Sequence, residues 1–328
     1  MVRSFVTGAT GFLGSHLVRR LIQEGHQLTL MARRPDFQLF PHHYPIQWVS
    51  GDVLDSKEQL AKLMDRHQRV YHLAGLIGYR PELRQRMFEV NVLGTEHLVD
   101  AAMMAGVEKF FYVSSVAAIG ASTNPHEILN EESAYNLKER HWGYFDSKHE
   151  AERRLIQKTQ SHPIMTYILN PSTIYGAGDW KKGSRKVQLL VARGKMPFCP
   201  PGGVNVVHVE DVIESFILLE KFGKKNRRYI IAHENILLKT LFEWIAQVAK
   251  AKPPRVTLPC AILKGIGYFA DFANYLGLRM PFNSENAGVA CLYHWFSNER
   301  AKAELQLSFR SSFVAVKESI ESYLSQGV

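Results

Sequence analysis

The sequence predicts an α/β fold, in which a doubly wound parallel sheet is followed by a smaller, mostly helical C-terminal lobe. Short runs rich in β-branched residues alternate with longer amphipathic stretches through the first half of the chain, which is typical of βαβ units. Glycines at positions 8, 11 and 14 join the first expected strand to the first expected helix. After about residue 175 the alternation gives way to helices.

Each expected element of the first half follows from its hydrophobic period. The strands carry consecutive apolar residues, whereas the helices carry apolar residues at helical spacing. Both faces of a parallel sheet are covered, and ligands bind at the carboxyl ends of its strands. The expected strands are Val2–Thr7, Gln27–Ala32, Ile46–Val49, Val70–Leu73, Phe110–Ser114 and Pro163–Leu169, and the expected helices are Phe12–Glu24, Ser56–Arg66, Glu82–Ala105 and Trp142–Gln160.

We expect this sheet, a Rossmann fold, to occupy residues 1–175, with further sheet elements from about 204–232. The lobe, interleaved with the last strands, is expected over residues 176–328 and would bind the substrate. The expected later strands are Val204–Val209 and Arg228–Ile231, and the expected later helices are Lys186–Arg193, Glu210–Lys221, Leu238–Lys250, Ile262–Leu276 and Phe313–Leu324.

The composition excludes several classes of protein. The 328 residues include 40 Lys and Arg against 31 Asp and Glu, which gives a formal net charge of +9, and 46% of them are hydrophobic. Such a chain is neither disordered nor a collagen or coiled-coil rod. The basic residues form clusters at 33–34, 181–186 and 221–228, without the interleaved aromatic residues of a nucleic-acid surface. We therefore expect a small-molecule substrate and no nucleic-acid partner, and we interpret the two later clusters as solvated loops and helix ends.

The cysteines point to a reducing compartment. They fit neither a disulfide framework nor a metal site, and no metal is expected. A cytoplasmic protein is the natural interpretation, because no charged and apolar leader precedes the first strand. The three cysteines are Cys199, Cys260 and Cys291.

The longest apolar stretch, Leu258–Leu278, is interrupted by Lys264, Asp271 and Asn274. It therefore lacks the run of about 18 or more uninterrupted apolar residues that a membrane-spanning helix needs. Core packing of the lobe explains the stretch, but a lid over the substrate or peripheral contact with a membrane surface would also suit it.

The glycine motif predicts a phosphate cradle. Gly8 permits a tight turn, Gly11 lets the backbone approach a pyrophosphate, and Gly14 lets the helix and the strand pack closely. The amino end of the helix Phe12–Glu24 would point its unpaired N–H groups at the phosphates. The alternative is a left-handed turn without a ligand, but a strand before the motif and a helix after it favour a dinucleotide.

The carboxyl end of the second strand favours NADP as the cofactor, with NAD as the alternative. This position holds an acidic residue in NAD-binding folds and an Arg in NADP-binding folds, and here it holds Arg33 and Arg34. Two solvated arginines are the other interpretation. Asp52, after the third strand, is placed to accept a hydrogen bond from the adenine amino group, unless it caps the helix near Ser56.

A tyrosine and a lysine are spaced for proton transfer. On the helix Trp142–Gln160, Tyr144 and Lys148 lie one turn apart on the same face. An adjacent ammonium favours the phenolate and so lowers the pKa of a tyrosine. Ser114 and Ser115 end the fifth strand at the edge where a substrate would lie. Each feature has a purely structural alternative, an amphipathic helix surface for the first and a strand-terminating turn for the second.

The chain carries six motifs whose sequential order resembles the signature of the extended short-chain dehydrogenases/reductases, the NAD-dependent epimerase/dehydratase-like proteins. Later segments, residues 170–176 and 207–212, are similar to further landmarks of that family. The resemblance thus covers most of residues 1–180 and extends into the lobe. The six motifs are Thr7–Gly14, Asp52-Val53, His72–Gly75, Asn91–Thr95, Val113–Ser115 and Tyr144–Lys148.

The resemblance implies a role for each matching residue. Tyr144 would donate or accept the proton, Lys148 would hold the nicotinamide ribose and lower the pKa of Tyr144, and Ser115, with Ser114 as the fallback, would orient the carbonyl. Asn91 would help to position Lys148 through water. The implied cofactor-binding residues are Gly8, Thr10, Gly11, Phe12, Leu13, Gly14, Arg33, Arg34, Asp52, Val53, Leu73, Ala74, Gly75, Tyr144, Lys148, Pro171 and Ser172.

The form Leu169-Asn170-Pro171-Ser172 is closer to the dihydroflavonol-4-reductase and 3β-hydroxysteroid dehydrogenase branch than to the nucleotide-sugar epimerases. That branch usually has Arg before the proline, where this chain has Asn170. We therefore hypothesise an NADP-dependent oxidoreductase that acts on a ketone or secondary alcohol of a fairly apolar small molecule. The alternatives are a nucleotide-sugar epimerase/dehydratase with tightly bound NAD and a non-catalytic NADP-binding sensor. By family analogy, the helices 82–105 and 142–160 would form the seam of a homodimer.

Overall fold

The computed structural model describes residues 1–179, 185–278, 280 and 282–326. Its central sheet has seven parallel strands in the order β10-β6-β5-β4-β1-β2-β3. The order runs outward in both directions from β1 and β4, so the expected doubly wound sheet is confirmed and its topological switch point lies between these two strands. The strands are β1 (Arg3–Thr7), β2 (Gln27–Ala32), β3 (Ile46–Ser50), β4 (Arg69–His72), β5 (Lys109–Val113), β6 (Met165–Pro171) and β10 (Arg227–Ile231).

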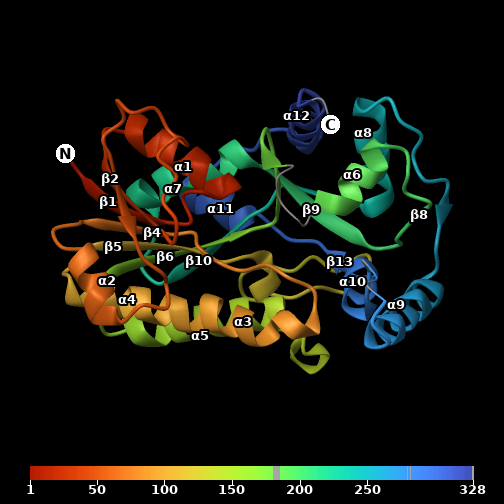
Figure 1. Ribbon diagram of the computed structural model, residues 1–328, viewed down its shortest axis with the longest axis horizontal. Helices are drawn as coiled ribbons and strands as arrows, with labels where there is room; N and C mark the ends of the chain where they lie inside the picture. Colours follow the sequence, from red (N-terminus) through yellow and green to blue (C-terminus); the bar gives the residue numbers. More distant parts are fainter. Residues whose placement is uncertain (180–184, 279, 281, 327–328) are drawn as a thin grey trace.

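Helices cover both faces of this sheet (Figure 1). One face packs against α1 (Phe12–Gln23), α7 (Val209–Phe222) and α11 (Glu299–Leu305). The other face packs against α2 (Lys57–Leu63), α4 (Gly94–Met104) and α5 (Gly143–Thr159). Each face has its own apolar core, which explains why the strands are apolar throughout and do not alternate.

The helix expected over 82–105 is present without a break, but it is not a uniform α-helix. It consists of a 3-10 turn (Pro81–Leu83), α3 (Arg84–Phe88), a π-helical turn (Glu89–Leu93) and α4. A π turn holds one more residue than an α turn and is frequent at functional sites. Here it holds Asn91, whose side chain is buried.

The C-terminal lobe contains more sheet than its helical pattern predicts. β9 and β10 were both expected to extend the main sheet, but only β10 does, because β9 pairs with β7, β11 and β13. Both faces of β9 are buried, so its apolar run does not reveal which sheet it joins. The strands are β7 (Thr173–Tyr175), β8 (Phe198–Cys199), β9 (Gly203–His208), β11 (Glu234–Leu237), β12 (Val256–Thr257) and β13 (Tyr293–His294).

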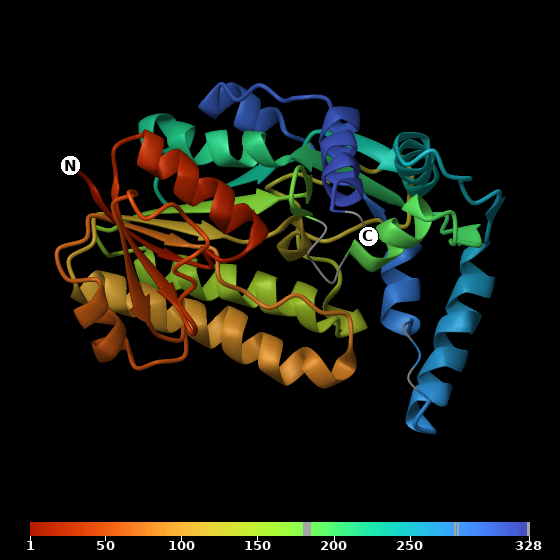
Figure 2. The ribbon, with the colours of Figure 1, turned by 45° about the horizontal axis from the view of Figure 1, so that its top comes forward.

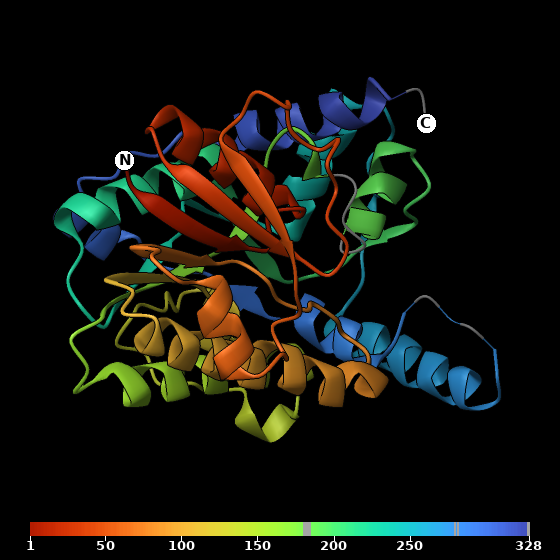
Figure 3. The ribbon, with the colours of Figure 1, turned by 60° about the vertical axis from the view of Figure 1, so that its left-hand side comes forward.

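Five helices complete the described part of the lobe. Three of them, α6 (Lys186–Ala192), α8 (Leu238–Val248) and α12 (Ser312–Leu324), share an apolar core with β7 and β9. The other two, α9 (Cys260–Tyr275) and α10 (Ser284–Ala290), form a pair that extends away from the rest of the molecule, as two views show (Figures 2 and 3).

A chain of buried hydrogen bonds crosses the sheet at its switch point. Thr7 Oγ1 lies 2.8 Å from His72 Nδ1, and His72 Nε2 lies 3.0 Å from Thr95 Oγ1. Thr95 donates to the Asn91 carbonyl, so its oxygen must accept from His72, which fixes the neutral Nε2–H tautomer. Asn91 Nδ2 then donates to Ser147 Oγ, which donates to the Tyr144 carbonyl. The first strand is thus connected to the start of α5.

His72 is fully buried, and its burial, together with the nearby Lys148 ammonium, lowers its pKa to about 3. An unfolded chain would protonate this histidine below its ordinary pKa of about 6.5. Between these two values the unfolded state therefore binds more protons, and stability falls as the pH falls.

We expect His72→Gln to weaken this acid dependence, because a glutamine can bond to both threonines but does not titrate. The measurement is the melting temperature from pH 7.5 to pH 4, compared with His126→Gln, which removes an exposed histidine. The slope should be shallower for His72→Gln alone. Equal slopes for the wild type and both variants would contradict the buried, neutral assignment.

Candidate active site

The glycines of the predicted phosphate cradle lie between β1 and α1. Gly8 has a left-handed φ of +76°, and a Cβ there would be 2.6 Å from the Ala74 nitrogen. A Cβ on Gly14 would lie only 2.1 Å from the Gly8 carbonyl oxygen. Gly11 is the N-cap of α1, and no side chain caps the first N–H groups of this helix. The segment thus has the close packing and the open helix terminus that a dinucleotide pyrophosphate requires.

Two exposed arginines follow β2. Arg33 and Arg34 come directly after Ala32, the last residue of β2. Within the described part of the chain, neither guanidinium takes part in a hydrogen bond or a salt bridge. Both are therefore available to a phosphate, as the assignment to NADP requires.

Asp52 does not cap α2, because Ser56 does so with a complete capping box. Instead, the Asp52 carboxylate accepts the backbone N–H of Leu54 at 3.0 Å, in a tight turn after β3. Its expected bond to adenine remains a prediction. Its neighbour Val53 is buried against Gly94, where an added Cβ would lie 2.7 Å from Val53 Cγ2.

The remaining residues expected to bind cofactor lie at the carboxyl ends of β4 and β6. Leu73, Ala74 and Gly75 continue directly from β4, next to Gly8. Pro171 ends β6, and Ser172 donates its backbone N–H to the Ile231 carbonyl at 3.0 Å. Both strands are in the main sheet, so these residues share one edge with the cradle. Within the cradle itself, Leu13 is buried, Phe12 is half-buried and Thr10 is exposed.

Tyr144, Lys148 and Ser115 lie together at this edge. Tyr144 and Lys148 are both buried on the same face of α5. Lys148 Nζ donates to the Val113 carbonyl at 2.9 Å and lies 5.0 Å from the centre of the Tyr112 ring. The Ser115 side chain accepts the Ala117 N–H at 3.1 Å, and its hydroxyl lies near enough to that of Tyr144 to influence the Tyr144 pKa.

Burial governs the electrostatics of this group. It lowers the pKa of Lys148 to about 8, against the opposing effect of the Glu152 carboxylate. It also raises the pKa of Tyr144, and the nearby Ser115 hydroxyl acts in the other direction. Burial therefore sets the direction of the Tyr144 pKa, and the expected lowering of this pKa by Lys148 remains a prediction.

Asn91 adjoins Lys148 across Gly75. A Cβ on Gly75 would lie 3.2 Å from Asn91 Oδ1 and 3.5 Å from Lys148 Nζ. The Asn91 amide also exchanges two hydrogen bonds with the backbone of Leu76. Asn91 therefore holds the segment after β4 in place, and its expected action on Lys148 through water remains a prediction.

Asn170, the departure from the related branch, holds the backbone of Ser115. Its Nδ2 donates to the Ser115 carbonyl at 2.9 Å and to the Glu152 carboxylate. Arg228 of the neighbouring strand β10 lies 3.5 Å from the same carboxylate. A guanidinium from β10 thus neutralises Glu152, and the shorter Asn170 bridges Glu152 and Ser115.

Five residues around the site had no role assigned from the sequence, although four of them lie inside the motifs. Thr7 and His72 are polar residues at inward positions of buried strands. Their polarity was the only feature of the sequence that could have indicated the hydrogen-bond chain, which also contains Thr95 and Ser147. Tyr79 had no signal, because it lies in an irregular segment. Its ring centre is 6.3 Å from that of Tyr144, within an apolar cluster that includes Leu76, Met87, Ala117, Phe145 and Leu292.

The later basic clusters are not simply solvated. Arg185 is buried, pairs with Asp179 at 3.0 Å and lies over the Tyr175 ring. Arg227 pairs with Glu304 at 2.7 Å. Lys181 and Lys182 lie outside the described residues. Ion pairs to acidic residues outside the clusters account for the difference, one of them nearby in the sequence (Asp179) and one distant (Glu304).

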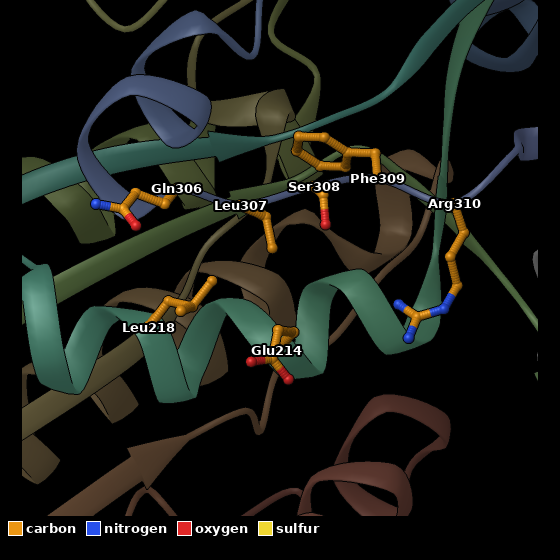
Figure 4. A pocket seen from close by; sticks show the side chains of 7 residues that line it. All are labelled: Glu214, Leu218, Gln306, Leu307, Ser308, Phe309 and Arg310. Atoms are coloured by element: carbon orange, nitrogen blue, oxygen red, sulfur yellow. The ribbon is translucent and has the colours of Figure 1, made fainter.

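A cavity of about 450 Å³ lies elsewhere, between α7 and residues 306–310. Figure 4 shows Glu214 and Leu218 of α7 on one side and the extended 306–310 segment on the other. It contains none of the expected site residues. The candidate active site is therefore the edge of the main sheet that carries the cradle and Tyr144.

The comparisons with known proteins agree with this geometry. Residues 4–232 match the model of the NAD dependent epimerase/dehydratase family. The chain is 34% identical over 264 residues to a putative dihydroflavonol 4-reductase of Synechocystis sp., covering 78% of this chain and 75% of that protein. It is 27% identical over 329 residues to sterol demethylase protein B of Methylococcus capsulatus, covering 99% of both. The crystal structure of gox2253 superposes with a TM-score of 0.86 at 31% identity, covering 100% of this chain and 99% of that one.

The family match covers more than half of the chain, and it includes the cradle, Ser115, Tyr144 and Lys148. It confirms the resemblance that the ordered motifs indicated. The chain therefore belongs to the NAD dependent epimerase/dehydratase family and is an NAD(P)-dependent enzyme of the extended short-chain dehydrogenase/reductase type.

Proposed function

We propose that the protein is an NADP-dependent oxidoreductase that acts on a ketone or secondary alcohol of a fairly apolar small molecule. The observation that carries the proposal is the group formed by the buried Tyr144 and Lys148 and the half-buried Ser115 at the edge of the sheet, where Tyr144 lies in an apolar cluster. A hydroxyl network of this kind can stabilise and protonate an alkoxide.

Each residue has a distinct role in the proposal. The nicotinamide would supply or accept the hydride. Ser115 donates a hydrogen bond to the substrate oxygen, and Tyr144 transfers the proton to or from that oxygen. Lys148 donates one of its three N–H groups to the Val113 carbonyl, so the other two can bind the nicotinamide ribose. Its positive charge would shift Tyr144 toward its ionised form.

Two observations support NADP and an apolar substrate. Arg33 and Arg34 offer guanidinium forks at the position where a 2′-phosphate would lie. The side chains around Tyr144 are aromatic or aliphatic, including Tyr79, Phe145 and Leu292. The relatives named as a dihydroflavonol reductase and a sterol demethylase protein are consistent with such a substrate.

A nucleotide-sugar epimerase/dehydratase with tightly bound NAD is the second candidate, favoured by the family that the chain matches. Arg185, one of the basic residues that could meet the diphosphate of a nucleotide sugar, already pairs with Asp179. The absorbance spectrum of the purified protein separates the candidates, because an epimerase would retain nicotinamide. Retention of both Tyr144 and Lys148 argues against a non-catalytic sensor.

The proposal includes a cytoplasmic homodimer. The three cysteines form no disulfide, which suits a reducing compartment.

The outer faces of α3 and α5 run side by side (Figure 1), with Phe88 exposed beside a hollow of about 470 Å³ that both helices line. This surface is where the dimer seam is proposed.

Tyr144→Phe should lower kcat at least about 100-fold, because it removes the proton-transferring hydroxyl. Steady-state assays with ketones and NADPH would measure the loss, and cofactor binding measured by thermal shift should persist. Tyr167→Phe, which removes a hydroxyl from the core on the opposite face of the sheet, is the matched control. Normal turnover by Tyr144→Phe would disprove its role.

The double variant Arg33→Gln and Arg34→Gln should weaken binding of NADP about 10- to 100-fold and leave binding of NAD nearly unchanged. The reason is that charge-assisted hydrogen bonds to a phosphate contribute about 1.5–3 kcal/mol. Titration of both cofactors by calorimetry is the measurement. Arg66→Gln removes an exposed guanidinium far from the cradle and should have no effect. A wild-type preference for NAD would overturn the assignment.

A further inference from the structure

Helix α9 has an unusual distribution of side chains. Its buried positions are Leu263, Gly267, Ala270 and Ala273, mostly small residues, and Gly267 packs so closely on α10 that a Cβ there would lie 2.9 Å from the Ala287 Cβ. The larger apolar side chains point away from the protein. Small residues inside and aromatic residues outside are the reverse of an ordinary surface helix.

The exposed apolar surface is large and continuous. Ten of the 22 exposed large hydrophobic side chains among the described residues lie between positions 256 and 280. Tyr268, Phe269, Phe272 and Tyr275 expose 67%, 66%, 59% and 87% of their surface. At about 100° per residue, the outward apolar side chains from Ile262 to Leu276 span about half of the helix circumference. Isolated exposed hydrophobic residues need no explanation, whereas a continuous patch marks an interaction site.

The charges around this patch have one predominant sign. From Trp244 to Ser284 the sequence holds a single acidic residue, Asp271, whose carboxylate faces the backbone N–H of Ser284 on α10. The same segment holds five basic residues, which are Lys250, Lys252, Arg255, Lys264 and Arg279. The patch is therefore accompanied by positive charge that complements an anionic surface.

The shape of the patch favours a deformable partner. α9 and α10 extend beyond the body of the molecule (Figures 2 and 3), so the apolar face is convex. A convex apolar ridge with aromatic residues and nearby lysines is typical of helices that lie in the interface of a membrane. No helix among the described residues is long and apolar enough to cross a bilayer, so contact with one of its surfaces is the geometry to consider.

We propose that the outward face of α9 docks on the surface of a bilayer that contains anionic lipid. Phe269, Phe272 and Tyr275 enter the boundary between headgroups and acyl chains. The basic side chains of Lys250, Lys252, Arg255 and Lys264, from the described part of the same segment, meet the anionic headgroups. This contact needs neither cofactor nor substrate, so its test is separate from the test of the proposed function.

The experiment is flotation of the full chain with vesicles of phosphatidylcholine alone and of phosphatidylcholine with phosphatidylglycerol. The wild type should float with the anionic vesicles, and less so at high salt. The double variant Phe269→Ser and Phe272→Ser should lower the partition into anionic vesicles at least about tenfold. The reason is that each substitution removes apolar surface that the wild type would bury in the bilayer. The double variant Val314→Ser and Leu324→Ser, which removes two exposed apolar residues from α12, should float like the wild type.

Light scattering and melting temperature complete the test. Both double variants should remain folded and keep the oligomeric state of the wild type. Failure of the wild type to float, or equal flotation of the Phe269 and Phe272 variant, would overturn the proposal. So would a wild-type dimer that this variant converts to a monomer, because the occupant of the face would then be a second copy of the chain.

Discussion

The arrangement of the site depends on the buried hydrogen bonds that link Thr7, His72, Thr95 and Asn91. Each of these polar groups is shielded from water, so leaving one without a partner would cost about 1–3 kcal/mol. The chain has a single consistent direction only if His72 is neutral. Because it begins on the strand before the cradle and ends at the π turn beside α5, the phosphate-binding and proton-transferring parts of the site are held in one fixed relation.

The sequence was sufficient for the first six strands of the main sheet, because parallel strands covered on both faces produce apolar runs that alternate clearly with helices. It was not sufficient where a choice depends on tertiary partners. β9 has the same apolar character as β10 but joins another sheet. The π turn at Glu89–Leu93 adds one residue to a helix whose sequence pattern is otherwise continuous. The pattern does not reveal the turn, which contains the buried Asn91.

Spacing alone brought Tyr144 and Lys148 to one face of a helix, but it could not give their electrostatics. Burial decides these, and burial comes from Tyr79, Phe145 and Leu292, which lie far apart in the sequence. The same limit applies to Asn170. By its motif, Asn170 departs from the arginine that is usual in the related branch. In the structure, Asn170 bridges Ser115 and Glu152, and Arg228 of the next strand supplies the positive charge beside Glu152.

Helix α10 connects the two apolar regions of the molecule. On one side, Ala287 packs against Gly267 of α9, and on the other a Cβ on Gly288 would lie 2.6 Å from the Trp142 ring. Trp142 is the N-cap of α5, two residues before Tyr144. Close packing through small residues leaves little room for the helices to slide independently. Helix α10 is therefore packed between the outer helix α9 and the start of α5, the helix that holds Tyr144.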